Sequence, residues 1–219
     1  MNHLELGIQA IQEKDYEQAV VHFSNAIEEE PNNPLGFINF GNLLARMNDT
    51  ERAERFFQKA ITLDGESATA YYSLANLYYE QERYEEAAKL YEKSIRFNIQ
   101  GADAYFMLGK CFERLGNEKL SLPYLQRASE LDPTDVQIRL SYGIVLAALE
   151  MFKEAEPEFM FVIQNDLNNA DAHYNLGVLY AVSTDRTEDA LYHLKQAYTL
   201  QPAFDQARYV YDMIALRNN

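Results

Sequence analysis

Tyrosine side chains are concentrated in one short stretch of this 219-residue sequence. Residues 70–87, AYYSLANLYYEQERYEEA, contain five tyrosines placed around Asn76. A tyrosine ring buries a large apolar area while its hydroxyl group finds a hydrogen-bond partner, and an asparagine amide both donates and accepts. The stretch therefore indicates packing and recognition.

Residues that could carry a reaction are few and scattered. His3, His22, His173 and His193 show no spacing typical of a metal site, and the sequence has no GxxxxGK[ST], GxGxxG or HExxH motif. The one cysteine, Cys111, falls at a helix position that holds leucine or valine elsewhere in the chain, which predicts an inert buried thiol. Acidic runs such as EEE lack the convergent partners that acid–base catalysis needs. We therefore expect no catalytic residue, no metal and no cofactor.

The charge balance limits the partners of the protein. The sequence has 34 acidic and 19 basic residues, a formal net charge of -15. Such an excess of carboxylates disfavours binding to nucleic-acid phosphates and to anionic membrane leaflets. A single cysteine fits a reducing compartment. The sequence shows no secretory signal and no apolar run near the roughly 20 residues that span a bilayer. We expect a cytoplasmic protein that binds neither nucleic acid nor membrane.

Small residues recur along the chain every 34 residues. They stand at Gly7, Gly41, Ala75, Gly109, Gly143 and Gly177. Large apolar residues recur in step with them, at Phe23, Phe57, Tyr91, Leu125, Phe159 and Leu194. A small residue allows two helices to approach closely, and a large one fills the space between them. The interval therefore predicts a repeat built from packed helices.

Each repeat is expected to hold two helices. Apolar residues within a repeat fall at the i, i+3, i+4 and i+7 spacing of an amphipathic helix. Residues suited to cap a helix N-terminus precede each first helix, at Asn33, Ser67, Gly101, Asp135 and Asn169.

The repeat resembles the tetratricopeptide repeat (TPR) family. The stretches that carry the resemblance are FINFGNLLARMNDTERAERFFQKA, AYYSLANLYYEQERYEEAAKLYEKS and AHYNLGVLY. It divides the chain into six repeats, at 1–33, 34–67, 68–101, 102–135, 136–169 and 170–204. A capping helix is expected over 205–217. The resemblance implies one all-α domain over 1–219, a right-handed superhelical solenoid in which the first helix of each repeat lines a concave groove.

On this frame the tyrosines of the quoted stretch have two roles. Three are expected to pack between helices: Tyr71, Tyr78 and Tyr84. Two face the groove, Tyr72 and Tyr79, with Asn76 between them. A rigid aromatic ring buries much area at small entropic cost, and an amide pairs with both the N–H and the C=O of a peptide backbone.

The same face continues in the other repeats. The predicted groove residues are Ile38, Asn39, Asn42, Arg46, Tyr72, Ser73, Asn76, Tyr79, Asp103, Phe106, Lys110, Arg114, Tyr174 and Asn175. Other residues on this face, such as Ile8, could equally pack against the next helix. The polarity of the groove stays open, because its cations alternate with acids. These charged residues are Arg46, Lys110 and Arg114 beside Glu80, Asp103 and Glu113.

We therefore expect a non-enzymatic scaffold or adaptor, a monomer whose groove binds an extended segment or short helix of one or more partner proteins and so mediates complex assembly. TPR proteins that clamp the C-terminal carboxylate of heat-shock chaperones are not matched, since only Asn42 holds a residue that such a clamp requires. The alternative is self-association, in which the groove accepts helix 205–217 of another copy.

Overall fold

The computed structural model describes residues 2–217, which form thirteen helices and no strand. The predicted all-α class is confirmed. Met1 and residues 218–219, the ends of the predicted domain, lie outside the described residues. The chain divides into two compact units, Met1–Leu115 (unit 1) and Gly116–Asn219 (unit 2). One domain over the whole chain therefore stays a prediction.

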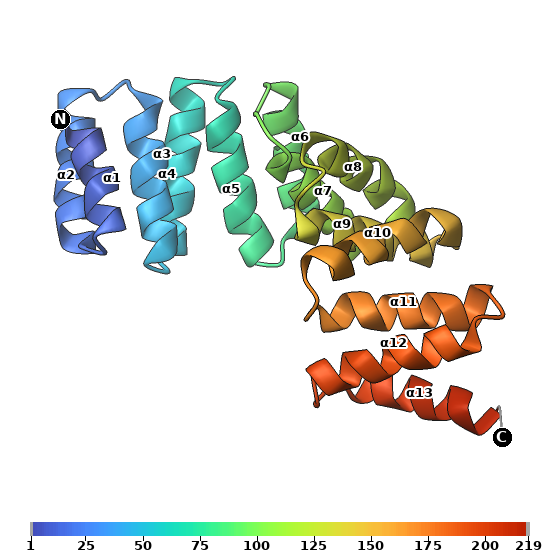
Figure 1. Ribbon diagram of the computed structural model, residues 1–219. Coiled ribbons are helices and arrows are strands. Elements are labelled where there is room, and N and C mark those ends of the chain that lie inside the picture. The colour runs from blue at the N-terminus through green and yellow to red at the C-terminus, as the bar shows by residue number, and fades with distance from the viewer. Residues whose placement is uncertain (1, 218–219) are drawn as a thin grey trace. The chain divides into compact units, whose positions relative to one another are not determined.

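The helices follow one another as the 34-residue interval predicts, two to a repeat (Figure 1). Unit 1 contains α1 (His3–Gln12), α2 (Tyr16–Glu29), α3 (Pro34–Arg46), α4 (Thr50–Leu63), α5 (Ala68–Glu80), α6 (Tyr84–Arg96) and α7 (Asp103–Arg114). Unit 2 contains α8 (Glu118–Leu131), α9 (Val136–Ala148), α10 (Phe152–Asn165), α11 (Ala170–Ser183), α12 (Thr187–Leu200) and α13 (Asp205–Arg217). The odd-numbered helices up to α11 are the first (A) helices of the repeats, and the even-numbered ones are the second (B) helices.

Helix packing in each unit follows the order of the repeats. In unit 1 the A helices α1, α3 and α5 lie side by side, and each B helix packs against its own A helix and the next one (Figure 1). The same order holds from α9 to α12 in unit 2, where α13 packs against α11 and α12 in the place of a further A helix. This arrangement leaves one side of α1, α3 and α5 without a covering helix from unit 1.

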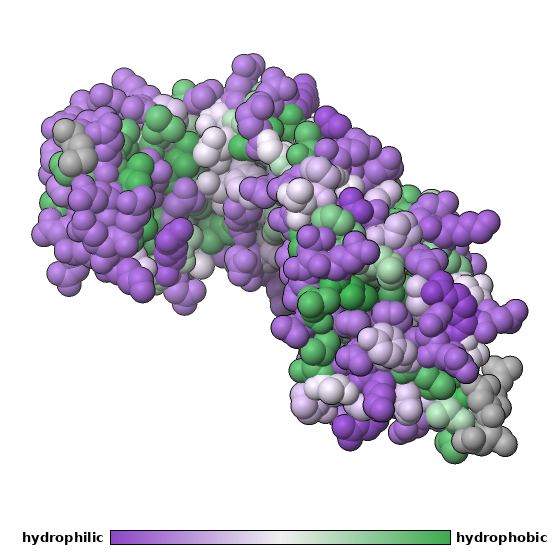
Figure 2. All heavy atoms as spheres, viewed as in Figure 1, coloured by the Kyte–Doolittle hydropathy of each residue, from purple (hydrophilic) through white to green (hydrophobic). Residues whose placement is uncertain are grey.

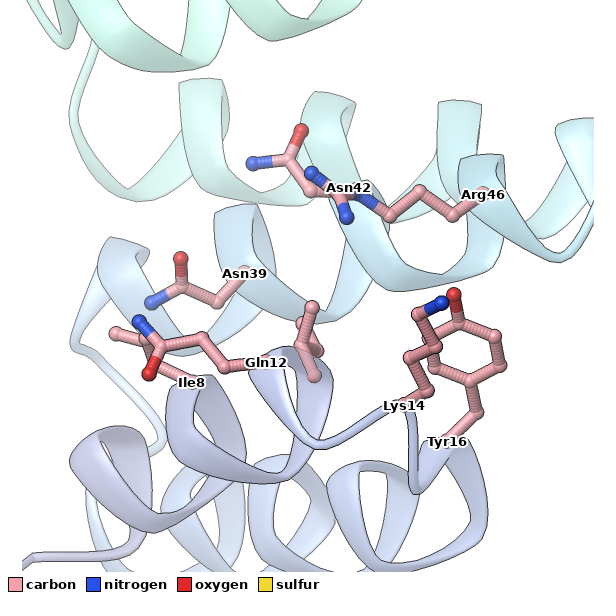
Figure 3. A pocket seen from close by; sticks show the side chains of 8 residues that line it. Ile8, Gln12, Lys14, Tyr16, Asn39, Asn42 and Arg46 are labelled. Atoms are coloured by element: carbon pink, nitrogen blue, oxygen red, sulfur yellow. The ribbon is translucent and has the colours of Figure 1, made fainter.

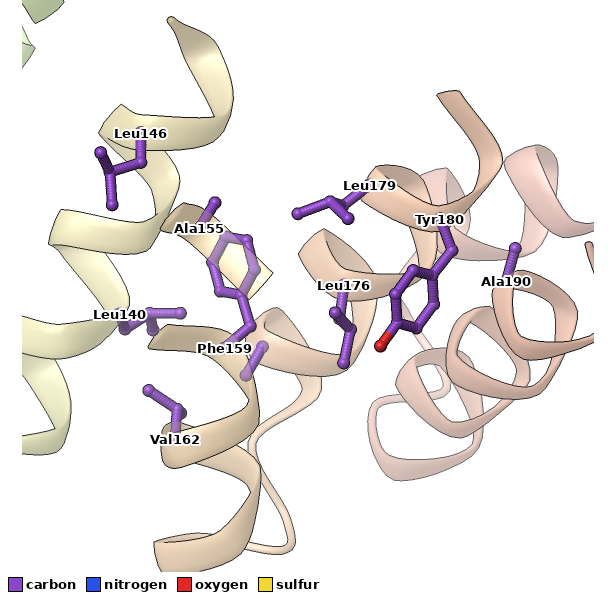
Figure 4. Close-up of a cluster of buried hydrophobic side chains, with 10 residues drawn as sticks. Leu140, Leu146, Ala155, Phe159, Val162, Leu176, Leu179, Tyr180 and Ala190 are labelled. Atoms are coloured by element: carbon purple, nitrogen blue, oxygen red, sulfur yellow. The ribbon is translucent and has the colours of Figure 1, made fainter. Parts of the chain in front are cut away.

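Glycine allows the two helices of a repeat to approach closely. A Cβ atom on Gly41 would stand 2.6 Å from Cε1 of Phe57, whose side chain is 1% exposed. That distance is well inside a van der Waals contact, so the ring leaves room for a glycine alone. Gly143 faces Phe159 in the same way, at 2.9 Å. Phe159 belongs to a buried cluster formed by α9, α10, α11 and α12 (Figure 4). The predicted pairing of small with large residues is confirmed at both places.

A matched pair of side chains recurs at one repeat position among the described residues, the first member on the A helix and the second on the B helix. Examples are His3 with His22, Phe37 with Phe56, Arg139 with Glu158, and His173 with His193. The two Nδ1 atoms of the last pair lie 2.9 Å apart, and the Phe37 and Phe56 ring centroids 5.9 Å apart. The residue types differ among these repeats, but the two members of each pair are always of compatible types.

A polar clamp joins successive repeats at two places. The Tyr78 hydroxyl on α5 donates to Oε1 of Glu54 on α4 at 2.8 Å, and the Arg83 guanidinium lies 3.6 Å from the centre of the Tyr78 ring. The same arrangement recurs in unit 2 with Tyr180, Glu156 and Arg186. A carboxylate, a phenol and a cation thus satisfy one another where two repeats meet.

Most turns between an A and a B helix place one residue in the left-handed region. These residues are Lys14 (φ 61°), Asn48 (φ 62°), Glu82 (φ 60°), Gly116 (φ 68°) and Glu150 (φ 60°). The conformation lets the turn amides reach the last carbonyls of the A helix, as where Asp15 N donates to Ala10 O at 2.8 Å. Glycine adopts the left-handed conformation without a steric penalty, whereas Lys14, Glu82 and Glu150 adopt it at a cost.

The predicted helix caps are confirmed in part. Three of them accept a hydrogen bond from a first-turn backbone N–H: Asn33, Asp135 and Asn169. Ser67 occupies the cap position of α5 but makes no such bond. The prediction for Gly101 is wrong. Its φ of 92° extends the turn, and Ala102 is the residue that precedes α7.

Candidate functional site

A hollow of ≈ 510 Å³ opens on unit 1 between α1 and α3 (Figure 3). It is lined by Ile8, Ile11, Gln12, Lys14, Tyr16, Asn39, Asn42 and Arg46. Six of these side chains are polar, and none is an acid. Three belong to the predicted groove residues: Asn39, Asn42 and Arg46. On the same face of unit 1, hydrophobic residues lie among hydrophilic ones (Figure 2).

The lining residues are positioned by the geometry of α3 and by the turn between α1 and α2. Asn39, Asn42 and Arg46 are spaced i, i+3 and i+7 along α3, so they share one face. The opposite face of α3 is buried, with Phe40 and Leu44 in the core. Lys14 and Tyr16 come instead from the turn after α1 and the first residue of α2. Asp15 caps α2 between them, accepting from Gln18 N at 3.0 Å.

The six polar side chains of the hollow are not engaged by the protein. Within residues 2–217, none of them makes a hydrogen bond or an ion pair with another group of the chain. Lys14 and Arg46 therefore place two positive charges without an ion-pair partner in the hollow of a chain whose net charge is -15. A ligand can bind these groups in exchange for water, without first breaking an internal bond.

Two predicted groove residues are buried, so the prediction is wrong for both. Ile38 is 2% exposed and packs against alanines of α4 and α5. Ser73 is 7% exposed. Side-chain length explains the difference, because half-buried Tyr72 occupies the repeat position of Ile38 and half-buried Asn39 that of Ser73. The longer side chains extend past the neighbouring helix and the shorter ones do not.

Tyr72 and Asn76 are half-buried and are held by Tyr91 of α6. The Tyr91 hydroxyl donates to Asn76 Oδ1 at 2.6 Å, and the Tyr72 ring packs edge-on against the Tyr91 ring with centroids 5.7 Å apart. Burial raises the pKa of Tyr72. The carbonyl oxygen of Asn76 is thus already used within the repeat, whereas part of the Tyr72 ring still faces solvent. Tyr71 and Tyr78 are 8% exposed, as expected for rings between helices.

The predicted charged residues of α7 are largely satisfied by neighbours. Lys110 Nζ lies 2.8 Å from Oε1 of Glu113, so these two charges neutralise each other. The Tyr79 hydroxyl raises the pKa of Arg114, while the Tyr79 ring packs edge-on against Tyr84. Two further predicted residues of α7 are exposed or half-buried: Asp103 and Phe106.

The predicted residues of unit 2 are half-buried and packed on their own unit. The Tyr174 ring lies 4.9 Å from the Phe204 ring, and burial raises the pKa of Tyr174. Asn175 Nδ2 donates to the backbone oxygen of Asp171 at 2.8 Å. Neither residue lines the hollow of unit 1.

Gln12, Lys14 and Tyr16 were not among the predicted residues. Gln12 is the last residue of α1, and the other two follow it in or after the turn, where a helix-face pattern no longer applies. The one regularity that the sequence offers is that Lys14 stands 34 residues before Asn48, in the equivalent turn of the next repeat.

The one cysteine lies in the core, as its helix position predicts. Cys111 is fully buried, and burial raises the pKa of its thiol to about 12. In the described part of the chain, no three or more His, Cys, Asp or Glu side chains gather as a metal site would require. No helix there has the length and apolar character needed to cross a membrane.

Antiparallel helix pairs at a 34-residue interval, which lengthens to 35 between the last two B helices, define with the polar hollow on the A helices a helical repeat protein. The chain belongs to the TPR family, as its sequence resemblance indicates. The family model described as the Cilia and flagella-associated protein 70 C-terminal domain matches residues 2–176.

Several solved structures are similar to this chain. One is that of YrrB, described as a TPR protein with an unusual peptide-binding site. It is 41% identical, with a TM-score of 0.81 over 87% of this chain and 97% of YrrB. PilF of Pseudomonas aeruginosa is 19% identical, with a TM-score of 0.83 over 96% of both chains. MamA is 18% identical, with a TM-score of 0.69 over 78% of this chain and 92% of MamA. The last two show the fold alone. No curated protein matches the chain by sequence.

Proposed function

We propose that the chain is a non-enzymatic scaffold that binds a segment of a partner protein on the A-helix side of unit 1, with the hollow between α1 and α3 at its centre. The observation that carries this proposal is the set of six polar side chains in the hollow that no other group of the described chain engages. The TPR fold and the description of YrrB support the same reading.

The hollow suits an extended segment or a short helix. Asn39 and Asn42 each offer a donor and an acceptor one helical turn apart, and a peptide backbone offers the complementary groups. Ile8, which is 43% exposed, adds an apolar contact. Because the helices are packed before binding, only the partner segment has to be ordered, which lowers the entropic cost of binding. Such a scaffold assembles partners into complexes, and the single-cysteine composition favours the cytoplasm as its compartment.

Replacing the two amides tests the proposal. We expect Asn39→Ala with Asn42→Ala to lose partners that the wild-type chain captures from its native cell. Alanine is a stronger helix former than asparagine, so α3 should remain folded. The matched control is Lys59→Ala with Lys89→Ala, two exposed positions on B helices.

Quantitative mass spectrometry of the captured proteins gives the readout. A partner set retained by the control and lost by the amide variant is the expected result. Equal capture by all three chains would place the binding surface elsewhere. Loss of cooperative melting in the amide variant would show that these asparagines act in folding.

One observation favours the second candidate, self-association. The outer side of α13 exposes Tyr209 (65%), Met213 (55%) and Leu216 (75%), which stand at i, i+4 and i+7 and so form one apolar face. The groove of another copy could cover this face. Sedimentation velocity over a range of concentrations decides between the candidates, since a strict monomer eliminates the second.

A further inference from the structure

The hollow between α1 and α3 has a charge opposite to that of the protein. Lys14 and Arg46 reach it from two walls, the turn after α1 and the helix α3, and its lining contains no Asp or Glu. Neither cation forms an ion pair within the described residues. Lys110, on α7, is by contrast bound to both carboxylate oxygens of Glu113. The hollow is thus a cationic site on a chain of net charge -15.

The neutral groups of the hollow add donors around these charges. Tyr16, 37% exposed, contributes a hydroxyl beside Lys14, and Arg46 extends along α3 toward Asn42 (Figure 3). A carboxylate accepts from a guanidinium, an ammonium, a hydroxyl and an amide N–H₂ alike, and its hydrogen bonds to cations are the stronger ones. A basic group placed here would face two like charges, which disfavours it.

The arrangement favours a carboxylate within a chain over one at a chain end. Gln12 and Asn39 lie with Ile8 at one end of the hollow, and Lys14 and Tyr16 lie at the other (Figure 3). A backbone that pairs with the amides therefore continues past the cations, and a side chain can reach them. We infer that the hollow binds an aspartate or glutamate side chain of the partner segment, so the partner presents an acidic residue in an extended stretch. This inference rests on the proposed function and adds the chemistry of its ligand.

The turn at Lys14 allows a test that does not depend on a weakened fold. Lys14 adopts φ of 61°, so glycine fits this position better than lysine does. Lys14→Gly therefore removes one cation without straining the backbone, and Arg46→Gln keeps an exposed polar side chain at the end of α3. Glu82→Gly is the matched control, because Glu82 occupies the same turn position outside the hollow, with φ of 60°.

Selection from random peptides supplies the ligand. One library displays twelve-residue segments inside a phage coat-protein loop, and a second displays them with a free C-terminus. Each is selected on the wild-type chain, on Lys14→Gly/Arg46→Gln and on Glu82→Gly. We expect Asp and Glu to be enriched in the loop library by the wild-type and control chains, and not by the double variant.

A recovered peptide is then synthesised with its acidic residue as Glu or as Gln. We expect the Gln form to bind the wild-type chain about fivefold more weakly in fluorescence anisotropy, as an exposed charge pair is worth up to ~1 kcal/mol. The two forms should bind the double variant equally, and added salt should reduce the difference on the wild-type chain.

Each contrary outcome identifies what has failed. Peptides recovered without acidic enrichment, or bound equally by the wild-type and double-variant chains, overturn the carboxylate site and leave the scaffold function standing. Enrichment confined to the free C-terminus library assigns the cations to a terminal carboxylate and overturns the side-chain site. Recovery of no peptide by the wild-type chain overturns both proposals.

Discussion

Replacing Gly41 by alanine probes the contact that sets α3 against α4. The new Cβ would stand 2.6 Å from Cε1 and 2.9 Å from Cδ1 of Phe57. Carbon atoms pack at about 3.5–4.0 Å, so the ring has to move by roughly 1 Å. Phe57 is 1% exposed, so the ring is enclosed by the core.

Two opposing effects decide the size of the change. Overpacking a core costs about 1–3 kcal/mol. Alanine in place of glycine within a helix returns about 1 kcal/mol. Because the overlap falls on a fully enclosed ring, we expect overpacking to win, and Gly41→Ala to lower the free energy of unfolding by ~1 kcal/mol.

Urea unfolding followed by far-ultraviolet circular dichroism measures this change. Gly36→Ala is the control within the same helix, since its Cβ would meet Cγ1 of the half-buried Ile27 at 3.0 Å and its next neighbour at 3.8 Å, a smaller overlap than at Phe57. Gly36→Ala should therefore leave stability equal or raise it. In the Phe57→Leu background the penalty of Gly41→Ala should shrink, because the nearest ring atoms are gone. A Gly41→Ala chain as stable as the wild type would refute the packing argument.

Three further predictions concern turns, titration and the polar clamp. Glu82→Gly should raise the free energy of unfolding by ~0.5–1 kcal/mol in urea, since glycine tolerates a φ of 60° that glutamate adopts at a cost; a loss of stability would show that the side chain of Glu82 matters more than its backbone. Burial, and then the neighbouring His173, lower the pKa of His193 to about 4 from an ordinary 6.5. The unfolded chain therefore takes up a proton first as the pH falls. The free energy of unfolding should decrease between pH ~6.5 and ~4, by at most ~3 kcal/mol. In His193→Leu the urea midpoint should depend less on pH over that range. Tyr180→Phe removes the hydroxyl that donates to Glu156 at 2.8 Å and should cost ~1 kcal/mol in thermal unfolding; an unchanged midpoint would mean that the rest of the clamp suffices.

The repeat architecture was predictable because its signal is a packing requirement that recurs. Gly41 and Phe57 report one contact between two helices, and the same contact 102 residues later, at Gly143 and Phe159, requires the same residue types. Helix number and order follow from this interval. The start of α7 does not, because Gly101 has the φ freedom to lengthen a turn as readily as to end one.

The candidate site was predictable only in part, because exposure depends on side-chain length as well as on helix face. Ile38 and Ser73 lie on the predicted face, yet neighbouring helices cover such short side chains. Lys14 and Tyr16 were missed for a different reason. They belong to a turn, where direction follows from the left-handed backbone and not from a period of 3.6 residues.

The matched pairs constrain how such an array changes length during evolution. Duplicating or deleting a complete hairpin carries both members of its pair along, so the histidine of one arm still meets its histidine and the arginine its glutamate. A crossover inside a hairpin would place an imidazole against a phenylalanine ring, or a carboxylate against that ring without its arginine partner. Viable breakpoints therefore fall between hairpins, and the array grows or shrinks in whole modules.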